Sequence, residues 1–245
     1  MQEHELWLTA LFNQYLAGIA NTTLSLVGVR AGDPEKPWAN FVTMEILVVA
    51  ILMGVAALLR PRLSMDQPGK LQHVFESLYG FLRGQSEDIV GHHGPRYLRM
   101  FATLFFFILF SNLIGLIPTL EAPTMFPPVP LGCALIAYLY YNGMGFREQG
   151  VRKYLAHFAG PSPMLAPLMI PIEVISHLAR PLSLTIRLYA NMFAGEQVTL
   201  VFLGLTYLVA PVIFMGLHLF VAFLQAYIFA LLTMVYVGGA VSHEH

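Results

Sequence analysis

The chain has 245 residues, of which 57% are hydrophobic and only 11% are charged, and its formal net charge is −1. A soluble domain carries about 25% charged residues, so a chain with a mean hydropathy of +0.65 is too poor in charge to be solvated by water. The balanced charge gives no indication of a nucleic-acid partner. The single cysteine, Cys133, excludes an internal disulfide.

The amino-terminal part, residues 1–40, is predicted to be an external segment, and residues 41–245 are predicted to form a single transmembrane domain. The chain starts with MQEHELWL, which is acidic where a secretory signal would be basic. Targeting is therefore expected from the first spanning segment, residues 41–59, which ends at the basic sequence RPR.

Further apolar spans are predicted at residues 98–120 and 128–146, and a weaker one at residues 164–178 is interrupted by two prolines. The remaining stretch, residues 181–241, would measure about 90 Å as one helix, three times the roughly 30 Å of a hydrocarbon core. It is therefore predicted to form two long helices that break near Pro211, because proline lacks the amide that a helix interior needs. The expected fold is an all-α, multi-pass membrane protein with about five to six membrane helices.

Basic side chains are concentrated in two of the loops, between the first and second spans and between the third and fourth. By the positive-inside rule these loops are cytoplasmic, the amino terminus is outside and the carboxyl terminus is cytoplasmic. In the first loop, residues 71–84 have apolar side chains near helical spacing, which predicts an amphipathic helix on the membrane surface. The alternative is a soluble helix packed on other loops. The basic residues are Arg60, Arg62, Lys70, Arg83 and Arg96 in the first loop, and Arg147, Arg152 and Lys153 in the second.

Only four formally charged residues occur between positions 154 and 241, namely Glu173, Arg180, Arg187 and Glu196. An ionisable group at membrane depth costs at least about 2.5 to 3.5 kcal/mol on insertion scales and tends to mark an ion path or an internal pair. Glu173, Arg180 and Arg187 recur every seven residues and would share one face of a helix, with a bend expected at Pro181. Glu196 points to the opposite side from Arg187, about 13 Å along the helix.

Two polar residues of the last helix, His218 and Gln225, are also seven residues apart. If this helix is antiparallel to the preceding one, His218 approaches Glu196, and such a pair can pass a proton. The alternative for His218 and Gln225 is interhelical hydrogen bonding that only holds the bundle together. For Arg187, the alternative is a buried ion pair with Glu173 or Glu196.

Three sequences carry a family resemblance: RPLSLTIRLYANMFAGE at 180–196, HLFVAFLQAYIFALLTMVY at 218–236 and FSNLIGLIP at 110–118. They resemble subunit a of F-type ATP synthases, the static membrane subunit beside the rotating ring of c subunits. The resemblance covers the chain from about residue 41 to the end. It implies a proton-conducting stator subunit of the bacterial plasma (inner) membrane, in contact with the c-ring, the b-subunit peripheral stalk and the rest of the ATP synthase. It also implies that the last two helices are strongly tilted along the ring.

The resemblance also implies roles for individual residues. Arg187 is the coupling arginine that faces the c-ring carboxylate. Some family members carry an acid where this chain has Gly115, and Glu121 is the expected replacement. The external half-channel is expected to contain Asn191, Glu196, His218, Gln225, Asn112 and Glu121, and the cytoplasmic half-channel Glu173 and His177.

Other classes of protein are less well supported by the residues. An independent channel or secondary transporter often has internal repeats, and none is found here; a Na⁺-translocating version of the same subunit stays open. For an intramembrane enzyme, the pair His92 and His93 suggests a metal, but there is no HExxH motif. Without a phosphate-binding G-x-x-x-x-G-K-[ST] loop, no nucleotide is expected to bind directly, and no cofactor or metal is predicted.

Overall fold

The computed structural model describes residues 5–26, 33–64, 69–117, 119–150, 154, 166–205 and 209–241. Across these ranges the regular structure is entirely helical, which confirms the prediction of an all-α, multi-pass fold. Three of the described helices, namely α2, α4 and most of α8, are long and apolar enough to cross a membrane by length and composition. The helices are α1 (Trp7–Leu26), α2 (Asn40–Leu59), α3 (Lys70–Val90), α4 (Gly94–Ile114), α5 (Pro128–Gln149), α7 (Ala166–Leu205) and α8 (Val209–Val241), with short 3-10 helices at Arg60–Arg62 and Pro123–Met125.

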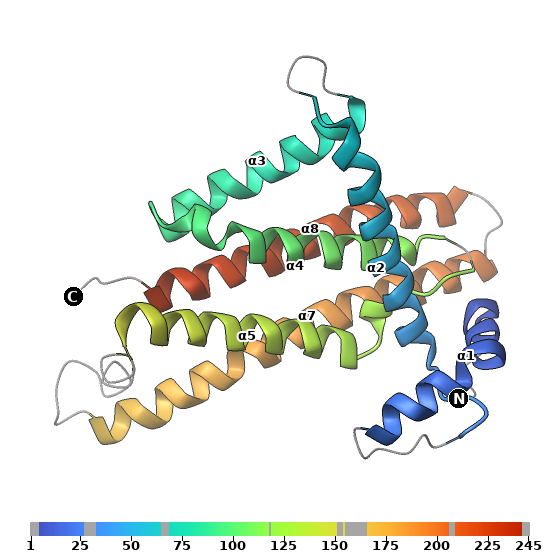
Figure 1. Cartoon of the computed structure of the whole chain (residues 1–245), viewed down its shortest axis with the longest axis horizontal. Helices are drawn as coiled ribbons and strands as arrows, with labels where there is room; N and C mark the ends of the chain where they lie inside the picture. Colours follow the sequence, from blue (N-terminus) through green and yellow to red (C-terminus); the bar gives the residue numbers. More distant parts are fainter. Residues whose placement is uncertain are drawn as a thin grey trace.

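Four long helices, α4, α5, α7 and α8, lie side by side, and α2 crosses them (Figure 1). Helix α8 is central because it packs against α4, α5 and α7 as well as α3. On α8 the fully buried residues Ala222, Ala226 and Ala230 recur every four positions. Small side chains at this spacing allow helices to approach closely where lipid provides no hydrophobic drive for association.

Helix α7 differs from the predicted arrangement. The weak fourth span and the helix that follows it form one continuous helix of 40 residues, with Pro171 and Pro181 inside it. Prolines are tolerated inside membrane helices where packing against neighbouring helices offsets the missing backbone hydrogen bond. Packing of α7 against both α5 and α8 outweighs the local tendency of proline to end a helix. The separate span predicted at 164–178 is therefore wrong.

The other predicted boundaries hold with small shifts. Helix α7 ends at Leu205 and α8 begins at Val209, so Pro211 lies in the first turn of α8, where a missing amide costs little. Helix α4 ends at Ile114 rather than at residue 120, and a turn follows it. Arg152 and Lys153, predicted in the second basic loop, and positions 164 and 165 of the fourth span lie outside the described residues.

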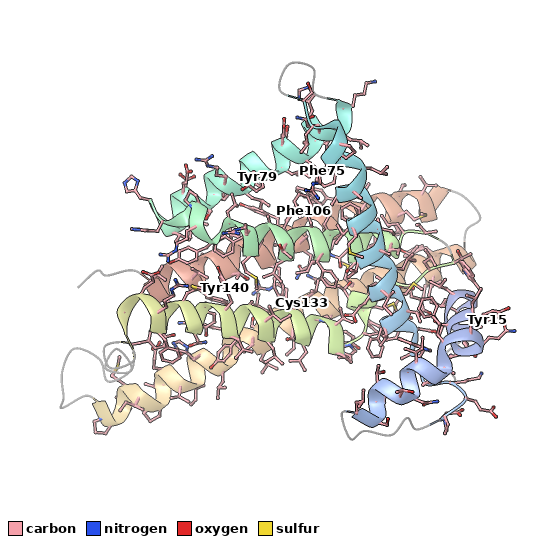
Figure 2. All side chains as sticks on the ribbon, viewed as in Figure 1. Tyr15, Phe75, Tyr79, Phe106, Cys133 and Tyr140 are labelled. Atoms are coloured by element: carbon pink, nitrogen blue, oxygen red, sulfur yellow. The ribbon has the colours of Figure 1, made fainter. Side chains whose placement is uncertain are left out.

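The predicted amphipathic helix is α3, which packs on the membrane helices α4 and α8 rather than on loops. Phe75 contacts Phe106 of α4 with ring centroids 5.3 Å apart (Figure 2), and Leu82 is fully buried. Near the start of α3, Leu71 and Val74 are 63% and 55% exposed. An apolar surface of this kind on a membrane-bound helix suits contact with lipid.

The amino-terminal segment contains a helix, α1, that the sequence analysis did not anticipate. Polar contacts tie it to the start of α2: the hydroxyls of Thr9 and Thr43 are 2.7 Å apart and both residues are buried. The side-chain oxygen of Asn13 accepts a hydrogen bond from the Trp38 amide at 2.9 Å. These contacts hold the beginning of the chain against the same end of the bundle as the first turn of α2 (Figure 1).

A glycine at the junction of α3 and α4 provides a test of this packing. A Cβ atom at Gly94 would overlap the carbonyl oxygen of Ser86, so Gly94→Ala is expected to destabilise the membrane domain by about 1 to 3 kcal/mol. Gly84→Ala is the matched control, since Gly84 lies within α3 and has open space at its Cβ position. The thermal unfolding midpoint in detergent measures the effect, and equal midpoints for the two variants would contradict this packing.

Candidate functional site

Arg187 occupies the middle of α7, beside the stripe that packs into the core. Leu184, Leu188 and Met192, spaced four residues apart, are at most 3% exposed, whereas Arg187 is half-buried. Among the described residues no carboxylate lies within ion-pair distance of its guanidinium. The alternative ion pairs with Glu173 and Glu196 are therefore not formed, and a permanent positive charge remains available on this face of α7.

A cavity of about 600 Å³ lies at the carboxyl end of α7, and we call it the larger cavity. Glu196 and Thr199 of α7 line it together with His218 of α8. The His218 imidazole lies against Gly195, where an added Cβ would be 3.5 Å from the ring. The antiparallel packing of α7 and α8 thus brings Glu196 and His218 into the same cavity, as the sequence predicts.

Glu196 and His218 do not bond to each other. The Glu196 Oε2 and His218 Nε2 atoms are buried, and neither has a hydrogen-bond partner in the described part of the chain. Leaving a buried polar group unsatisfied costs about 1 to 3 kcal/mol, so such atoms are normally paired with a mobile partner such as water. The cavity is large enough for several water molecules, and its few polar side chains, among them Glu196, Thr199 and His218, can hydrogen-bond to them.

Two further carboxylates line the larger cavity, and one of them was expected. Glu121 lies in the cavity wall, and its Oε2 accepts a hydrogen bond from the Asn40 side-chain amide at 3.4 Å. Gly115 is also in the wall, and a Cβ there would lie 2.7 Å from the Cβ of Ala122. Position 115 therefore has no space for an acidic side chain, while Glu121 supplies a carboxylate to the same cavity.

Glu5 is the carboxylate that sequence reasoning missed. It lines the larger cavity, forms an ion pair with Lys36 at 2.6 Å and accepts a hydrogen bond from Asn13. The hydrogen bond from Lys36, followed by that from Asn13, lowers the pKa of Glu5. No periodic pattern links the amino terminus to Glu121 or Glu196, and the acidic start of the chain was the only available signal.

Of the remaining predicted external residues, two form a pair and one lies apart. Asn191, one turn beyond Arg187, donates a hydrogen bond to the Gln225 carbonyl oxygen at 2.8 Å, which joins α7 to α8. Asn112 is fully buried and is not among the residues that line either cavity. Its amide donates to the Ala222 carbonyl at 3.2 Å and its oxygen accepts from the Thr124 hydroxyl at 2.6 Å. Asn112 thus connects α4 to α8 and to the loop before α5.

The smaller cavity, of about 300 Å³, lies near the other end of α7 and contains both residues predicted for the cytoplasmic side. The His177 Nε2 and Glu173 Oε1 atoms are 3.3 Å apart, and Arg180 Nη2 is 3.9 Å from the same oxygen. The spacing of four and seven residues places all three side chains on one face. Glu173 is therefore paired with Arg180 rather than with Arg187.

Two tyrosines that sequence reasoning did not identify complete this cluster. The Tyr141 hydroxyl is 3.2 Å from His177 Nδ1. The Arg180 guanidinium lies 5.7 Å from the centre of the Tyr141 ring and 5.2 Å from that of Tyr236, within the range of a cation–π contact. Contacts with Glu173, Tyr141 and Tyr236 therefore hold the Arg180 side chain in the wall of the smaller cavity.

The two cavities are well separated. Glu173 and Glu196 are about 35 Å apart along α7 at 1.5 Å per residue, and Arg187 lies between them.

His92 and His93 are exposed between α3 and α4. Within the described ranges, no group of three or more histidine, cysteine or acidic side chains is arranged to hold a metal ion.

Comparison with known proteins identifies the family of this chain. The family model of the ATP synthase A chain matches residues 42–238. The chain is 64% identical to ATP synthase subunit a of Solibacter usitatus over 236 residues, covering 96% of this chain and all of the relative. It is 50% identical to ATP synthase subunit a of Koribacter versatilis over 242 residues, covering 99% of each chain. The chain therefore belongs to the family of the membrane-embedded a subunits of F-type ATP synthases.

Proposed function

We propose that this chain is the proton-conducting stator subunit of its ATP synthase, with two offset aqueous half-channels that exchange protons with the carboxylates of a c-ring. The observation that carries the proposal is the pair of cavities near opposite ends of α7, with an unpaired Arg187 between them. Neither cavity includes Arg187 in its lining. A proton that enters one cavity therefore has to leave the chain before it can reach the other.

The larger cavity is proposed as the external half-channel. Its carboxylates and the His218 imidazole can each bind and release a proton, and water can connect them. Asn191 and Gln225 extend this polar surface from the cavity toward Arg187. Asn112 does not line this cavity, and its hydrogen bond to the Ala222 carbonyl is proposed to hold α4 in position against α8.

Arg187 is proposed to act on the c-ring carboxylate that passes it. An opposite charge within about 4 to 6 Å lowers the pKa of a carboxylate by about 1 to 3 units, so the guanidinium favours the ionised form. The same positive charge repels a proton that would cross directly from one cavity to the other. The remaining route is rotation of the ring, which converts about 2.3 kcal/mol per charge per 100 mV of membrane potential into torque.

The smaller cavity is proposed as the cytoplasmic half-channel, with Glu173 and His177 as the proton-carrying groups. The hydrogen bond between Tyr141 and His177 and the contact of Arg180 with Glu173 hold these two groups in position.

The helix lengths support a tilted arrangement along the ring. At 1.5 Å per residue, α7 with 40 residues measures about 60 Å, twice the thickness of the hydrocarbon core, so it can stay within the bilayer only when strongly tilted. Five helices, α2, α4, α5, α7 and α8, are proposed to cross the membrane. An odd number of crossings puts the two termini on opposite sides of the membrane, and the basic loops place the amino terminus outside and the carboxyl terminus in the cytoplasm of a bacterial inner membrane. The partners are the c-ring, the b-subunit stalk and lipid.

The choice between protons and Na⁺ can be tested in sealed vesicles that contain the whole ATP synthase. ATP synthesis driven by an imposed pH gradient is expected to continue without Na⁺ and to stop when a protonophore is added. Synthesis that requires a Na⁺ gradient would support the Na⁺-translocating alternative instead.

The role of Glu121 leads to a specific prediction. Glu121→Gln is expected to slow proton-driven ATP synthesis about tenfold or more, since removal of a positioned acid–base group typically costs a factor of 10² to 10⁴ and the remaining carboxylates compensate in part. Adding Gly115→Asp should not restore activity while Ala122 occupies the space beside it. Adding Ala122→Gly as well should restore activity.

The control for this series is Gly115→Asp with Ala122→Gly in the presence of the native Glu121, which reports whether the two changes perturb the fold. The rate of ATP synthesis in vesicles, divided by the amount of assembled complex, measures each effect. A normal rate for the single Glu121→Gln variant would contradict the proposed role of Glu121.

A further inference from the structure

A third cavity, of about 500 Å³, lies between α4 and α5, away from both proposed half-channels. These two helices both pack against α8, and a groove remains between them. Residues spaced three or four apart on each helix share one face, and these faces line the groove. We call this site the arginine groove; its residues are Arg96, Tyr97, Arg99, Met100 and Thr103 of α4 and Tyr140, Met144 and Arg147 of α5.

The arginine groove carries an excess of positive charge. Arg96 pairs with Glu148 at 2.8 Å, so one of its three guanidinium groups is neutralised. Arg99 and Arg147 are exposed and form no ion pair with any carboxylate in the described part of the chain. Two guanidinium groups thus face a shared cavity, and their planar sets of N–H donors match the oxygens of a phosphate ester.

The surroundings of the arginine groove favour a lipid over a soluble anion. Arg96 and Arg99 lie in the first two turns of α4 and Arg147 in the last turn of α5, so the charges gather where two membrane helices end. One turn inward from Arg96 and Arg147, the lining also contains the apolar side chains of Met100 and Met144. Figure 2 shows Tyr140 on the side of α5 that faces α4.

Beyond the arginine groove, the exposed surface of α5 is apolar. Ile136 and Leu139, within one turn of Tyr140, are 55% and 68% exposed. Acyl chains can lie on this surface while the headgroup phosphate stays at the helix ends. We propose that the arginine groove binds the headgroup of one anionic phospholipid. Basic pockets between membrane helices are a known type of site for such headgroups.

This proposal does not depend on the proton path, and it can be tested on the assembled ATP synthase in phosphatidylcholine nanodiscs. The probe is phosphatidylglycerol or diphosphatidylglycerol, which is added to the nanodiscs in increasing amounts. The number of lipid molecules bound per ATP synthase complex is measured at each amount, and the affinity is obtained from this titration. The double variant Arg99→Gln/Arg147→Gln is expected to bind the anionic lipid about thirtyfold more weakly, because each basic residue near the surface contributes about a fivefold factor. Arg83→Gln is the matched control: Arg83 is exposed on α3, pairs with Glu87 and does not line the groove.

Several outcomes are informative. A weakened affinity in the double variant, with Arg83→Gln unchanged and no competition by millimolar inorganic phosphate, supports the phospholipid. If inorganic phosphate alone binds and displaces the probe, the site is one for a free anion and the lipid proposal is wrong. Unchanged lipid binding in the double variant also overturns it. The Arg99→Lys/Arg147→Lys variant changes the same two positions but keeps both positive charges, so it should retain most of the affinity for the lipid. If it does, the weaker binding of the glutamine variant is due to the lost charge and not to misfolding.

Discussion

Replacement of Arg187 by alanine is expected to abolish proton-driven ATP synthesis in sealed vesicles. Without the guanidinium, the pKa of the c-ring carboxylate rises by about 1 to 3 units, which lowers the ratio of its ionised to its protonated form by about 10-fold to 1,000-fold. The barrier to direct proton movement between the two cavities is lost at the same time. The variant should therefore show two changes, a loss of synthesis and an increased passive proton leak.

The matched control is Arg83→Ala, which removes an exposed arginine from α3 that pairs only with a neighbouring glutamate. It should leave both synthesis and proton leak unchanged, since surface ion pairs contribute about 0 to 1 kcal/mol. ATP synthesis driven by an imposed pH gradient and passive proton uptake are measured on the same vesicle preparation. Normal synthesis by Arg187→Ala would disprove the proposed coupling role.

Replacement of Glu196 by glutamine should give the second largest effect. Glutamine keeps the size of the side chain but cannot bind and release a proton, so ATP-driven proton pumping should fall about 100-fold or more. The Glu196 Oε2 atom has no hydrogen-bond partner in the described part of the chain, and glutamine fits the same space. Assembly and the thermal stability of the complex should therefore remain close to normal.

Glu87→Gln is the control for this experiment, because it neutralises a carboxylate on α3 that lines neither cavity. Proton pumping is followed by the quenching of a pH-sensitive dye in inverted vesicles, and ATP hydrolysis is measured in parallel. A purely structural helix bundle would tolerate Glu196→Gln with unchanged proton flux, and that result would exclude Glu196 from the proton path.

Sequence reasoning succeeded where one helix or one antiparallel pair was sufficient. The seven-residue and four-residue spacings correctly put Glu173, His177 and Arg180 on one face of α7. The antiparallel turn between α7 and α8 correctly brought His218 into the cavity of Glu196. Both results depend only on the helix repeat and on the position of one chain reversal.

The same reasoning did not reach features that distant packing decides. Pro171 and Pro181 suggested separate helices, yet packing against α5 and α8 keeps α7 continuous through both. Glu5 joined the larger cavity through contacts of the amino-terminal segment with α2 and Lys36, which no periodicity reveals. Asn112, which the resemblance assigns to the external half-channel, is hydrogen-bonded to α8 and to the loop before α5, and its role in the proton path stays a prediction.

Composition and hydropathy by themselves determined that this chain is a helical membrane protein, and the rarity of charge marked Arg187 and its acidic neighbours as its chemically important groups. Only the tertiary structure decided which polar side chains line the same cavity. It also showed that Arg187 forms no ion pair with Glu173 or Glu196, and that three arginines of α4 and α5 line one groove. The physical reason is that spacing along a helix follows from its 3.6-residue repeat, whereas the approach of two helices depends on side chains that are far apart in the sequence.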